Sequence, residues 1–265
     1  MRHHGYDGPQ TGREVTRYVR VEMREVGDLR LEGRAPASDH LRGADGGVRA
    51  GALLTLLDSV GGLCGGLAAL PEGWVVSTNL AARTVRRDHV GPFRIDAAVA
   101  RRGRNSVVTD VAIRDEGAAG ALVVHGVLTS AILVPENGPP PWTRPLHLRV
   151  ADSPTDRRPL EEWIGVRHVD DATVEIDLTD ELRNPWGILH GGVVASLVDA
   201  AAAHAVGGTT TDVVLHFVAP NRTGPVHAHA RVAGVRSDGH VVRVELRDVG
   251  ARRVTAVAVA TVTPG

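Results

Sequence analysis

The chain contains 265 residues, of which 43% are hydrophobic and 23% are charged. This composition is typical of a soluble globular protein with one large or two small domains. Its 30 basic and 31 acidic residues leave a formal net charge of −1, which argues against nucleic acid as the main partner because phosphate binding needs a basic excess. The single cysteine, Cys64, excludes an intrachain disulfide and a multi-cysteine metal centre.

Residues 1–14 contain histidines and glycines without the apolar segment of a signal peptide, so we expect a flexible N-terminus. No segment approaches 18 consecutive uncharged apolar residues, so no membrane-spanning helix is expected. These two features favour a cytoplasmic protein without a membrane partner.

Residues 15–134 are predicted to form a first unit in the order strand, loop, helix and then several strands. The predicted helix covers residues 51–64 and contains Gly61 and Gly62, each of which weakens a helix by about 1 kcal/mol. Such a pair indicates that a neighbouring segment approaches closely. Residues 135–160 are rich in proline and lack a hydrophobic period, which is typical of a linker.

Residues 161–265 are predicted to form a second unit. Residues 192–206 are apolar on all sides except at Asp199 and His204, which predicts a helix that is buried all round. The Val-rich runs behind it are bounded by Gly, Pro, Asn and Asp and predict a meander of antiparallel strands. The expected fold class is therefore α+β, with an antiparallel sheet that wraps a buried helix.

The two units are copies of one another. Residues 78–117 align with residues 211–250 without a gap, and 12 of the 40 pairs are identical, including a Gly-Pro and an Arg-Asp dipeptide. Upstream, residues 53–58 align with residues 194–199, so Asp58 and Asp199 are equivalent. The change in offset means that the first copy contains extra residues after its aspartate.

A carboxylate in a buried helix must be paired, hydrogen-bonded or protonated. A structural explanation is that Asp58 and Asp199 satisfy a backbone end or bond across the helix pair. A functional explanation is that such a carboxylate acts as a base or a nucleophile. We favour the functional explanation because aspartate is a poor residue in the middle of a helix.

The loop before the second helix offers complementary chemistry. It begins at Asn184 and ends in His190, Gly191 and Gly192. The glycines allow a ligand to approach the backbone, and the helix N-terminus beyond them provides free amides for an oxyanion. Together with a nearby carboxylate, this loop predicts hydrolysis of an acyl group.

This loop and helix, together with residues 209–220 and the Gly-Pro turn after them, resemble the hotdog-fold acyl-CoA thioesterases of the phenylacetyl-CoA type. The resemblance covers nearly all of residues 165–264 and extends more faintly to residues 15–134 through the repeat. It implies a tandem, or double, hotdog protein whose units pair as a pseudo-dimer. It also implies hydrolysis of acyl-CoA between the two units, with no cofactor.

In such thioesterases one unit supplies an asparagine and the His-Gly-Gly turn, whose second residue donates the oxyanion amide. The other unit supplies the helix aspartate and a serine or threonine at the start of the next strand. The resemblance therefore implies one complete catalytic set, formed by Asn184, His190 and Gly191 with Asp58 and Ser77.

The other set is degenerate. It combines Asp199 and Thr210 with Gly43, Arg49 and Ala50, so the asparagine and histidine side chains are missing, although the Ala50 amide remains as a donor. Our hypothesis is that the complete set works and that the degenerate set is weak, inactive or devoted to binding.

Alternative functions stay open. A non-catalytic acyl-CoA-binding or regulatory protein fits the degenerate half of the motif, whereas a hotdog dehydratase or hydratase fits less well because Gly-Gly follows His190. In the enzyme, Asp58 either attacks the thioester carbonyl to give a mixed anhydride or activates water. We expect a homodimer or homotrimer of double hotdogs.

Two further groups of side chains have competing explanations. His227 and His229 lie on one face of a predicted strand without a third ligand nearby, so we expect no metal site. Arginines cluster within residues 83–104, where they either bind the phosphates of CoA or form a solvated face. We favour the solvated face.

Overall fold

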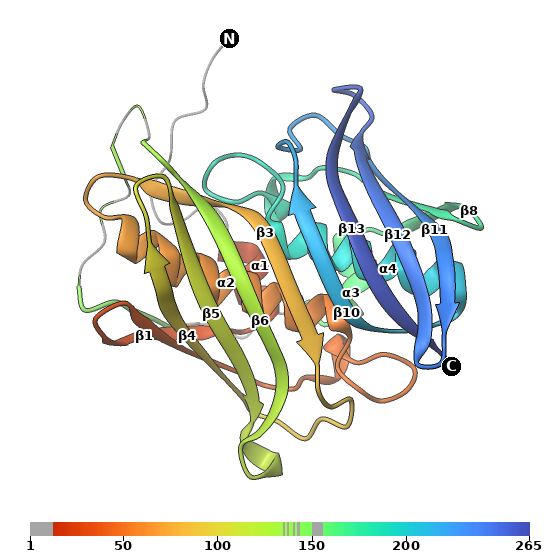
Figure 1. Cartoon of the computed structure of the whole chain (residues 1–265), viewed down its shortest axis with the longest axis horizontal. Helices are drawn as coiled ribbons and strands as arrows, with labels where there is room; N and C mark the ends of the chain where they lie inside the picture. Colours follow the sequence, from red (N-terminus) through yellow and green to blue (C-terminus); the bar gives the residue numbers. More distant parts are fainter. Residues whose placement is uncertain (1–12, 135, 137, 140, 142–143, 150–155) are drawn as a thin grey trace.

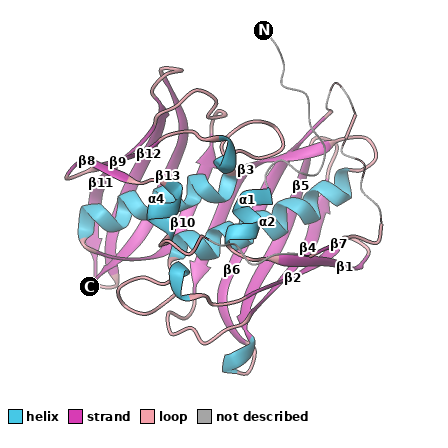
Figure 2. Ribbon diagram, turned by 180° about the vertical axis from the view of Figure 1, so that it is seen from behind, coloured by secondary structure: helices cyan, strands magenta, loops and turns pink. Residues whose placement is uncertain are grey.

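The computed structural model describes residues 13–134, 136, 138–139, 141, 144–149 and 156–265. Within them, the strands form one 13-stranded antiparallel sheet in the order β7-β1-β2-β4-β5-β6-β3-β10-β13-β12-β11-β9-β8. The sheet curves around two long helices, α2 (Ala50–Ala69) and α4 (Gly191–Val206) (Figures 1 and 2). Of the expected flexible N-terminus, residues 1–14, all but the last two residues lie outside the described residues.

The first half of the chain forms one unit around α2. Its other elements are α1 (Arg13–Tyr18), β1 (Glu22–Gly27), β2 (Arg30–Ala35), η1 (Asp39–Leu41), β3 (Trp74–Thr84), β4 (Phe93–Arg102), β5 (Ser106–Asp115), η2 (Glu116–Ala118) and β6 (Ala121–Leu133). The predicted start of this unit, residue 15, falls inside α1. The extra residues of the first copy lengthen α2 to 20 residues, against 16 in α4.

The second half repeats this order around α4. Its other elements are α3 (Leu160–Ile164), β8 (Arg167–Asp170), β9 (Thr173–Ile176), η3 (Asp180–Leu182), β10 (Gly208–Phe217), β11 (Val226–Arg236), β12 (Gly239–Asp248) and β13 (Arg253–Pro264). The strands that follow the long helices, β3 and β10, pair antiparallel and join the two half-sheets. The predicted α+β class and the pseudo-dimeric pairing of two units are confirmed.

Part of the predicted linker, residues 135–160, takes part in the fold. Its strand β7 (His147–Leu148) pairs with β1 and extends the sheet at that edge. Leu146 beside it is buried, and the Tyr18 hydroxyl donates a hydrogen bond of 2.6 Å to the Arg158 carbonyl oxygen. Residues 135, 137, 140, 142–143 and 150–155 of this segment lie outside the described residues.

Helix α2 is long and apolar enough to span a membrane by length and composition, contrary to the expectation from the sequence. However, 89% of its most apolar window is buried inside the protein. All of its residues except Gly62 and Leu63 are buried. The apolar composition of α2 is therefore explained by its place in the core.

The two long helices cross near their N-termini through a symmetric set of contacts. The Thr55 hydroxyl donates a hydrogen bond to the Gly192 carbonyl oxygen, and the Ser196 hydroxyl donates one to Gly51, both at 3.0 Å. A Cβ on Gly51 would lie 2.9 Å from the Ser196 Cα, and a Cβ on Gly192 would lie 2.8 Å from the Thr55 Cα. Gly192 thus permits helix packing, which corrects the expectation that it lets a ligand approach.

Buried aspartates explain why the repeat contains both a Gly-Pro and an Arg-Asp dipeptide. Asp248 accepts hydrogen bonds from four backbone N–H groups, those of Arg222, Thr223, Gly224 and Ala251. Burial favours a raised pKa for Asp248, but these donors outweigh it and hold the pKa below its ordinary value. Asp115 holds the equivalent turn of the first unit. Asp248 thereby fixes the loop after β10.

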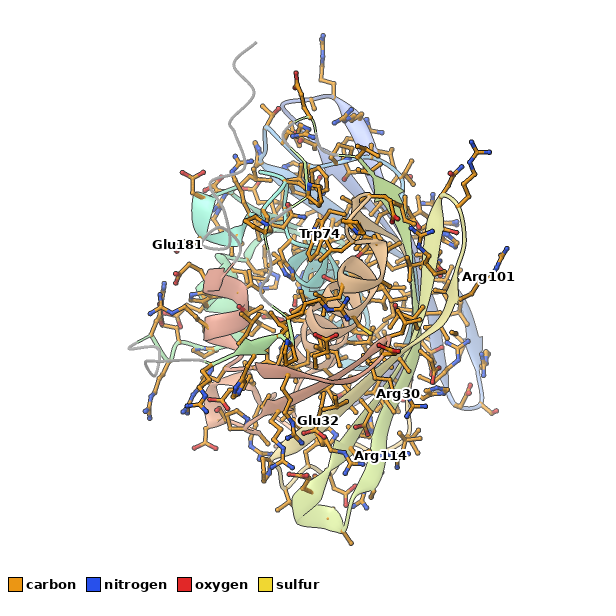
Figure 3. All side chains as sticks on the ribbon, turned by 90° about the vertical axis from the view of Figure 1, so that its left-hand side faces the viewer. Arg30, Glu32, Trp74, Arg101, Arg114 and Glu181 are labelled. Atoms are coloured by element: carbon orange, nitrogen blue, oxygen red, sulfur yellow. The ribbon has the colours of Figure 1, made fainter. Side chains whose placement is uncertain are left out.

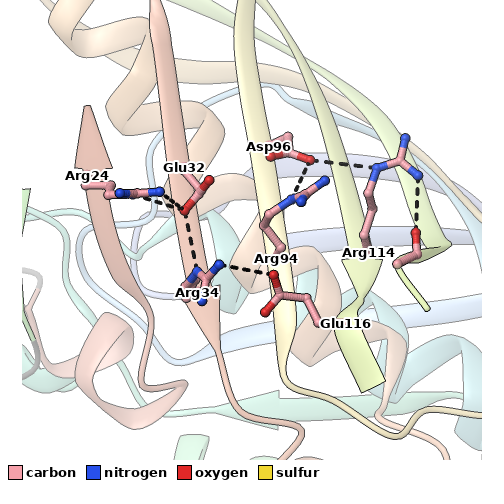
Figure 4. A network of polar contacts seen from close by, with 8 residues as sticks. Arg24, Glu32, Arg34, Arg94, Asp96, Arg114 and Glu116 are labelled. Atoms are coloured by element: carbon pink, nitrogen blue, oxygen red, sulfur yellow. Dashed lines mark hydrogen bonds and ion pairs between the residues drawn. The ribbon is translucent and has the colours of Figure 1, made fainter. Parts of the chain in front are cut away.

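The outer face of the first unit's sheet is covered by alternating charges. Ion pairs connect neighbouring elements here, among Arg24, Glu32, Arg34, Arg94, Asp96, Arg114 and Glu116 (Figure 4). Figure 3 shows charged side chains at the surface, whereas Trp74 lies beside α2. Exposed pairs of this kind each contribute less than about 1 kcal/mol to stability, so this network adds little to the stability of the fold.

Candidate active site

A cavity of about 420 Å³ lies between the two units. Its walls come from α2 and β3 of the first unit, and from the loop before α4 and the loop after β10 of the second. The structure places all residues of the predicted complete set around it, namely Asp58, Ser77, Asn184, His190 and Gly191. Residues that are more than 100 positions apart in the chain therefore share one cavity.

Asp58 provides the carboxylate of this cavity and is 6% exposed. The Ser77 hydroxyl donates a hydrogen bond of 2.8 Å to Asp58 Oδ1. A β-bulge between Ser77 and Asn79 interrupts the pairing of β3 with β6 at this point, and such bulges re-aim side chains. A Cβ on Gly191 would lie 2.7 Å from both Asp58 oxygens, so the carboxylate reaches the N-terminus of α4 only because residue 191 is glycine.

His190 is the N-cap of α4 and determines which backbone amides remain available. The Gly192 N–H donates a hydrogen bond of 3.0 Å to His190 Nδ1, so the neutral ring carries its proton on Nε2. Within the described residues, the Gly191 N–H has no hydrogen-bond partner. Burial lowers the pKa of His190, and the Asp58 carboxylate, 3.5 Å from Nδ1, offsets this only in part.

Asn184 shapes the turn that leads to His190. Its Oδ1 accepts hydrogen bonds from the Trp186 N–H at 2.9 Å and the Ile188 N–H at 3.4 Å. Its Nδ2 group has no partner among the described residues and remains available in the cavity wall. The Trp186 indole N–H donates a hydrogen bond of 3.0 Å to the Val75 carbonyl oxygen of β3, so the turn of the second unit is fixed onto the first.

The equivalent carboxylate on α4, Asp199, has different partners. The Gly51 N–H donates a hydrogen bond of 2.9 Å to Asp199 Oδ2. The Arg49 Nε atom lies 3.5 Å from the same oxygen, and its guanidinium also pairs with Glu161 at 2.5 Å. Asp199 is therefore held by a helix N-terminus and an arginine, in line with the structural explanation for a buried aspartate.

The space next to Ala50 and Thr210 of the degenerate set is small. Ala50 and Thr210 line a void of about 10 Å³, which is at the lower limit for one water molecule. His89 contributes to its wall and accepts a hydrogen bond of 2.9 Å from the Val48 N–H. Gly43, at the position of Asn184, has no side chain that could enter this space. The complete set thus surrounds a large cavity, whereas Asp199 lines neither that cavity nor the small void.

Parts of the large cavity come from segments that sequence reasoning missed. Thr16 of α1, Met23 of β1 and Leu148 of β7 line it, although β7 falls in the predicted linker. Strand β7 has only two residues, too few for a hydrophobic period to be recognised in the sequence. Gly62 on α2 also lines the cavity, whereas the sequence suggested only that it approaches a neighbouring segment.

The arginines of residues 83–104 do not line this cavity. Four of them form ion pairs elsewhere, namely Arg83 with Asp212, Arg86 with Asp88, Arg94 with Asp96 and Arg102 with Glu72. Arg222, in the loop after β10, is the arginine that lines the cavity among the described residues. The solvated-face interpretation of the arginine cluster therefore agrees with the structure.

The predicted histidine pair on β11 is engaged in hydrogen bonds. His227 contacts Glu175 at 2.8 Å and His229 contacts Thr173 at 3.0 Å. Over the described part of the chain, no group of three His, Cys, Asp or Glu side chains is placed to hold a metal ion.

Comparison with known proteins places the chain in a structural class. Residues 180–263 match the family model of the acyl-CoA thioesterase N-terminal domain. These residues include the Asn184–His190 turn, α4 and the four strands that follow it. No curated protein matches the chain.

Several solved structures share the fold over nearly the whole chain. A protein from Thermobifida fusca described as a putative thioesterase II is 18% identical, with 96% of this chain and 98% of that chain covered and a TM-score of 0.60. A hot dog fold protein from Alicyclobacillus acidocaldarius is 17% identical, with 95% and 98% covered and a TM-score of 0.62. The 12:0-ACP thioesterase from Umbellularia californica is 11% identical, with 89% and 95% covered and a TM-score of 0.63. The chain thus has the hotdog fold, and its residues 180–263 are similar to an acyl-CoA thioesterase domain.

Proposed function

We propose that the chain hydrolyses acyl-CoA thioesters in the large cavity between its units, with Asp58 as the reacting carboxylate. The contrast between two equivalent aspartates carries this proposal. Asp199 is held by the Gly51 N–H and by Arg49, whereas Asp58 accepts one hydrogen bond within the described residues, from Ser77, and faces the cavity. A buried carboxylate with so few donors costs stability, which is typical of a group kept for its chemistry.

His190 explains why the two aspartates differ. Its imidazole accepts the hydrogen bond of the Gly192 N–H, the amide that is equivalent to that of Gly51 in α2. An arginine side chain has no acceptor, so with Arg49 at the same position the Gly51 N–H bonds to Asp199 instead. A histidine N-cap therefore leaves both Asp58 and the Gly191 N–H available to a substrate.

The catalytic step follows from these positions. The thioester carbonyl oxygen accepts a hydrogen bond from the Gly191 N–H at the positive end of α4. This amide stabilises the negative charge that develops on the oxygen, which is typically worth about 3–4 kcal/mol per donor. Asp58 then either attacks the carbonyl carbon, giving a mixed anhydride that water cleaves, or removes a proton from an attacking water.

Both routes have the same overall stoichiometry. One water is consumed, the carbon–sulfur bond breaks, the sulfur leaves with a proton as free CoA, and the acyl group leaves as the acid. Ser77 orients the carboxylate through its hydrogen bond. The Asn184 Nδ2 group is available to position the water or the carbonyl, because Asn184 Oδ1 already holds the turn.

Free-thiol release tests the proposal. The panel contains acetyl-, octanoyl-, palmitoyl- and phenylacetyl-CoA, together with the same acyl groups on an acyl carrier protein. Cys64 is buried, but the signal of a thiol reagent is still corrected for it. We expect turnover of at least one acyl-CoA. Tight binding of acyl-CoA without release would identify a binding protein instead, and turnover of the carrier-protein thioesters alone would contradict the CoA assignment.

A further inference from the structure

Gly62 lies on the cavity wall at a helix position where glycine is intrinsically unfavourable. It lies in the middle of α2, one turn after Asp58 and on the same face of the helix. Glycine weakens a helix interior because it loses the most backbone freedom on folding. A glycine at this position therefore needs a reason in its surroundings.

Packing provides such a reason for two neighbouring glycines of α2. A Cβ on Gly61 would lie 2.9 Å from Val111 Cγ2, inside the sheet. A Cβ on Gly66 would lie 2.6 Å from the indole ring of Trp74. At both positions a side chain would collide with the fold.

Packing provides no reason at Gly62. A Cβ there would have one neighbour within 4 Å, Leu128 Cδ2 at 3.9 Å. The equivalent position of α4 is Ala203, so this place in the helix accepts a side chain. The space next to Gly62 is instead the cavity, which it lines.

The cavity wall continues from Asp58 along α2. Gly62 and Leu63 are the two residues of α2 that are not buried, and both line the cavity. One turn beyond Gly62, the Trp74 ring lies against Gly66 and lines the cavity as well. At 1.5 Å per residue, this stretch of α2 from Asp58 to Gly66 is about 12 Å long.

We infer that the acyl chain of the substrate extends from Asp58 across Gly62 to Trp74, with Gly62 as the residue that sets the width of the channel. This inference rests on the proposed function, because it places the thioester at Asp58. The walls along this path are the apolar side chains of Leu63 and Trp74, so the acyl group is an apolar chain of medium length. Trp74 closes the far end and limits that length.

Gly62→Ala and Gly65→Ala form a matched pair that tests this inference. Gly65 also lies in α2 but not in the cavity wall, and a Cβ there would be in ordinary contact with Thr109 Oγ1 at 3.4 Å. Both variants are expected to raise the unfolding temperature by about 2–4 °C, because each removes a helical glycine. Only Gly62→Ala is expected to change the choice of acyl chain.

For the native protein, kcat/KM is expected to rise by about fourfold per methylene until the chain reaches Trp74. Gly62→Ala should lower kcat/KM for octanoyl-CoA by about tenfold, the effect of overpacking a filled pocket, and leave acetyl-CoA within twofold. Gly62→Leu should extend the loss to butanoyl-CoA. An equal effect on acetyl- and octanoyl-CoA, or the same profile in Gly62→Ala as in Gly65→Ala, would overturn the inference.

Binding gives an independent readout if hydrolysis fails. The dissociation constants of S-ethyl-CoA and S-octyl-CoA, which cannot be hydrolysed, are measured by calorimetry for the same variants. A tenfold loss for S-octyl-CoA in Gly62→Ala alone supports the channel even if no thioester turns over, in which case the proposed hydrolysis is wrong and the inference stands. Equal affinity of all variants for S-octyl-CoA, or no binding of it by the native protein, overturns the inference.

Discussion

Substituting each of the two equivalent aspartates by asparagine should separate catalysis from stability. In Asp199→Asn, the side-chain oxygen can take the place of Oδ2, where it still accepts the Gly51 N–H and faces Arg49 Nε, but the negative charge opposite the arginine is lost. A charged hydrogen bond is replaced by a neutral one, at a cost of about 2 kcal/mol. The larger penalty for an unpaired buried charge does not apply, because Arg49 keeps Glu161.

This loss corresponds to a decrease in unfolding temperature of about 4–8 °C for a chain of this size. Asp58→Asn should behave in the opposite way, because Ser77 is the one donor to Asp58 within the described residues. Its unfolding temperature should stay the same or rise, while kcat/KM falls by roughly 10²–10⁴, the contribution of a positioned base or nucleophile.

Differential scanning fluorimetry and thiol release from octanoyl-CoA measure both quantities on the same preparations. The reasoning predicts a stable, inactive Asp58→Asn and a less stable, active Asp199→Asn. It would be refuted if Asp199→Asn abolished turnover while Asp58→Asn retained it, with both proteins folded by circular dichroism.

Three further variants test other contacts. Gly191→Ala should lower kcat/KM by at least about 100-fold with little loss of stability, since its Cβ would lie 2.7 Å from both Asp58 oxygens; unchanged steady-state kinetics would disprove the close approach. Asp248→Asn should lower the free energy of unfolding by about 3 kcal/mol at pH 7. The lowered pKa of Asp248 stabilises the fold above the unfolded-state pKa, and this contribution is lost as pH falls through the folded-state pKa. The difference in unfolding free energy between the variant and the native chain, measured by urea denaturation, should therefore shrink below about pH 4. A pH-independent difference would be inconsistent with this. Trp186→Phe removes the 3.0 Å hydrogen bond to the Val75 carbonyl oxygen. It should lower the free energy of unfolding by about 1 kcal/mol in urea denaturation and raise KM in steady-state kinetics. An unchanged KM would argue against a role of this bond in holding the turn.

The internal repeat allowed much of the fold to be predicted. The Val-rich runs bounded by turn residues, the two apolar helices and the shared turn dipeptides indicate paired α+β units from the sequence alone. The buried helix aspartates and the His-Gly-Gly turn indicated where to look for a site, because a carboxylate and free amides are unusual in such surroundings. The structure places Asp58, His190 and Gly191 around one cavity, whereas Asp199 does not line it.

Other features depend on long-range contacts that leave no local pattern. The partners of Asp199 are contributed by residues near the start of α2, about 150 positions away, so the sequence indicated a degenerate set but not which groups hold this carboxylate. The distinction between Gly61 and Gly62 needs the positions of the strands and of the cavity. Leu148 of β7 lines the cavity, but this strand has only two residues, too few for a hydrophobic period to show in the sequence.

The most direct test of the account is a crystal structure of the Asp58→Asn variant with octanoyl-CoA bound. The account predicts one ligand per chain in the large cavity, with the thioester oxygen about 2.7–3.1 Å from the Gly191 N atom and the acyl chain beside Gly62. A thioester bound beside Asp199 and Arg49, or one in the cavity whose carbonyl oxygen is out of reach of Gly191, would contradict it.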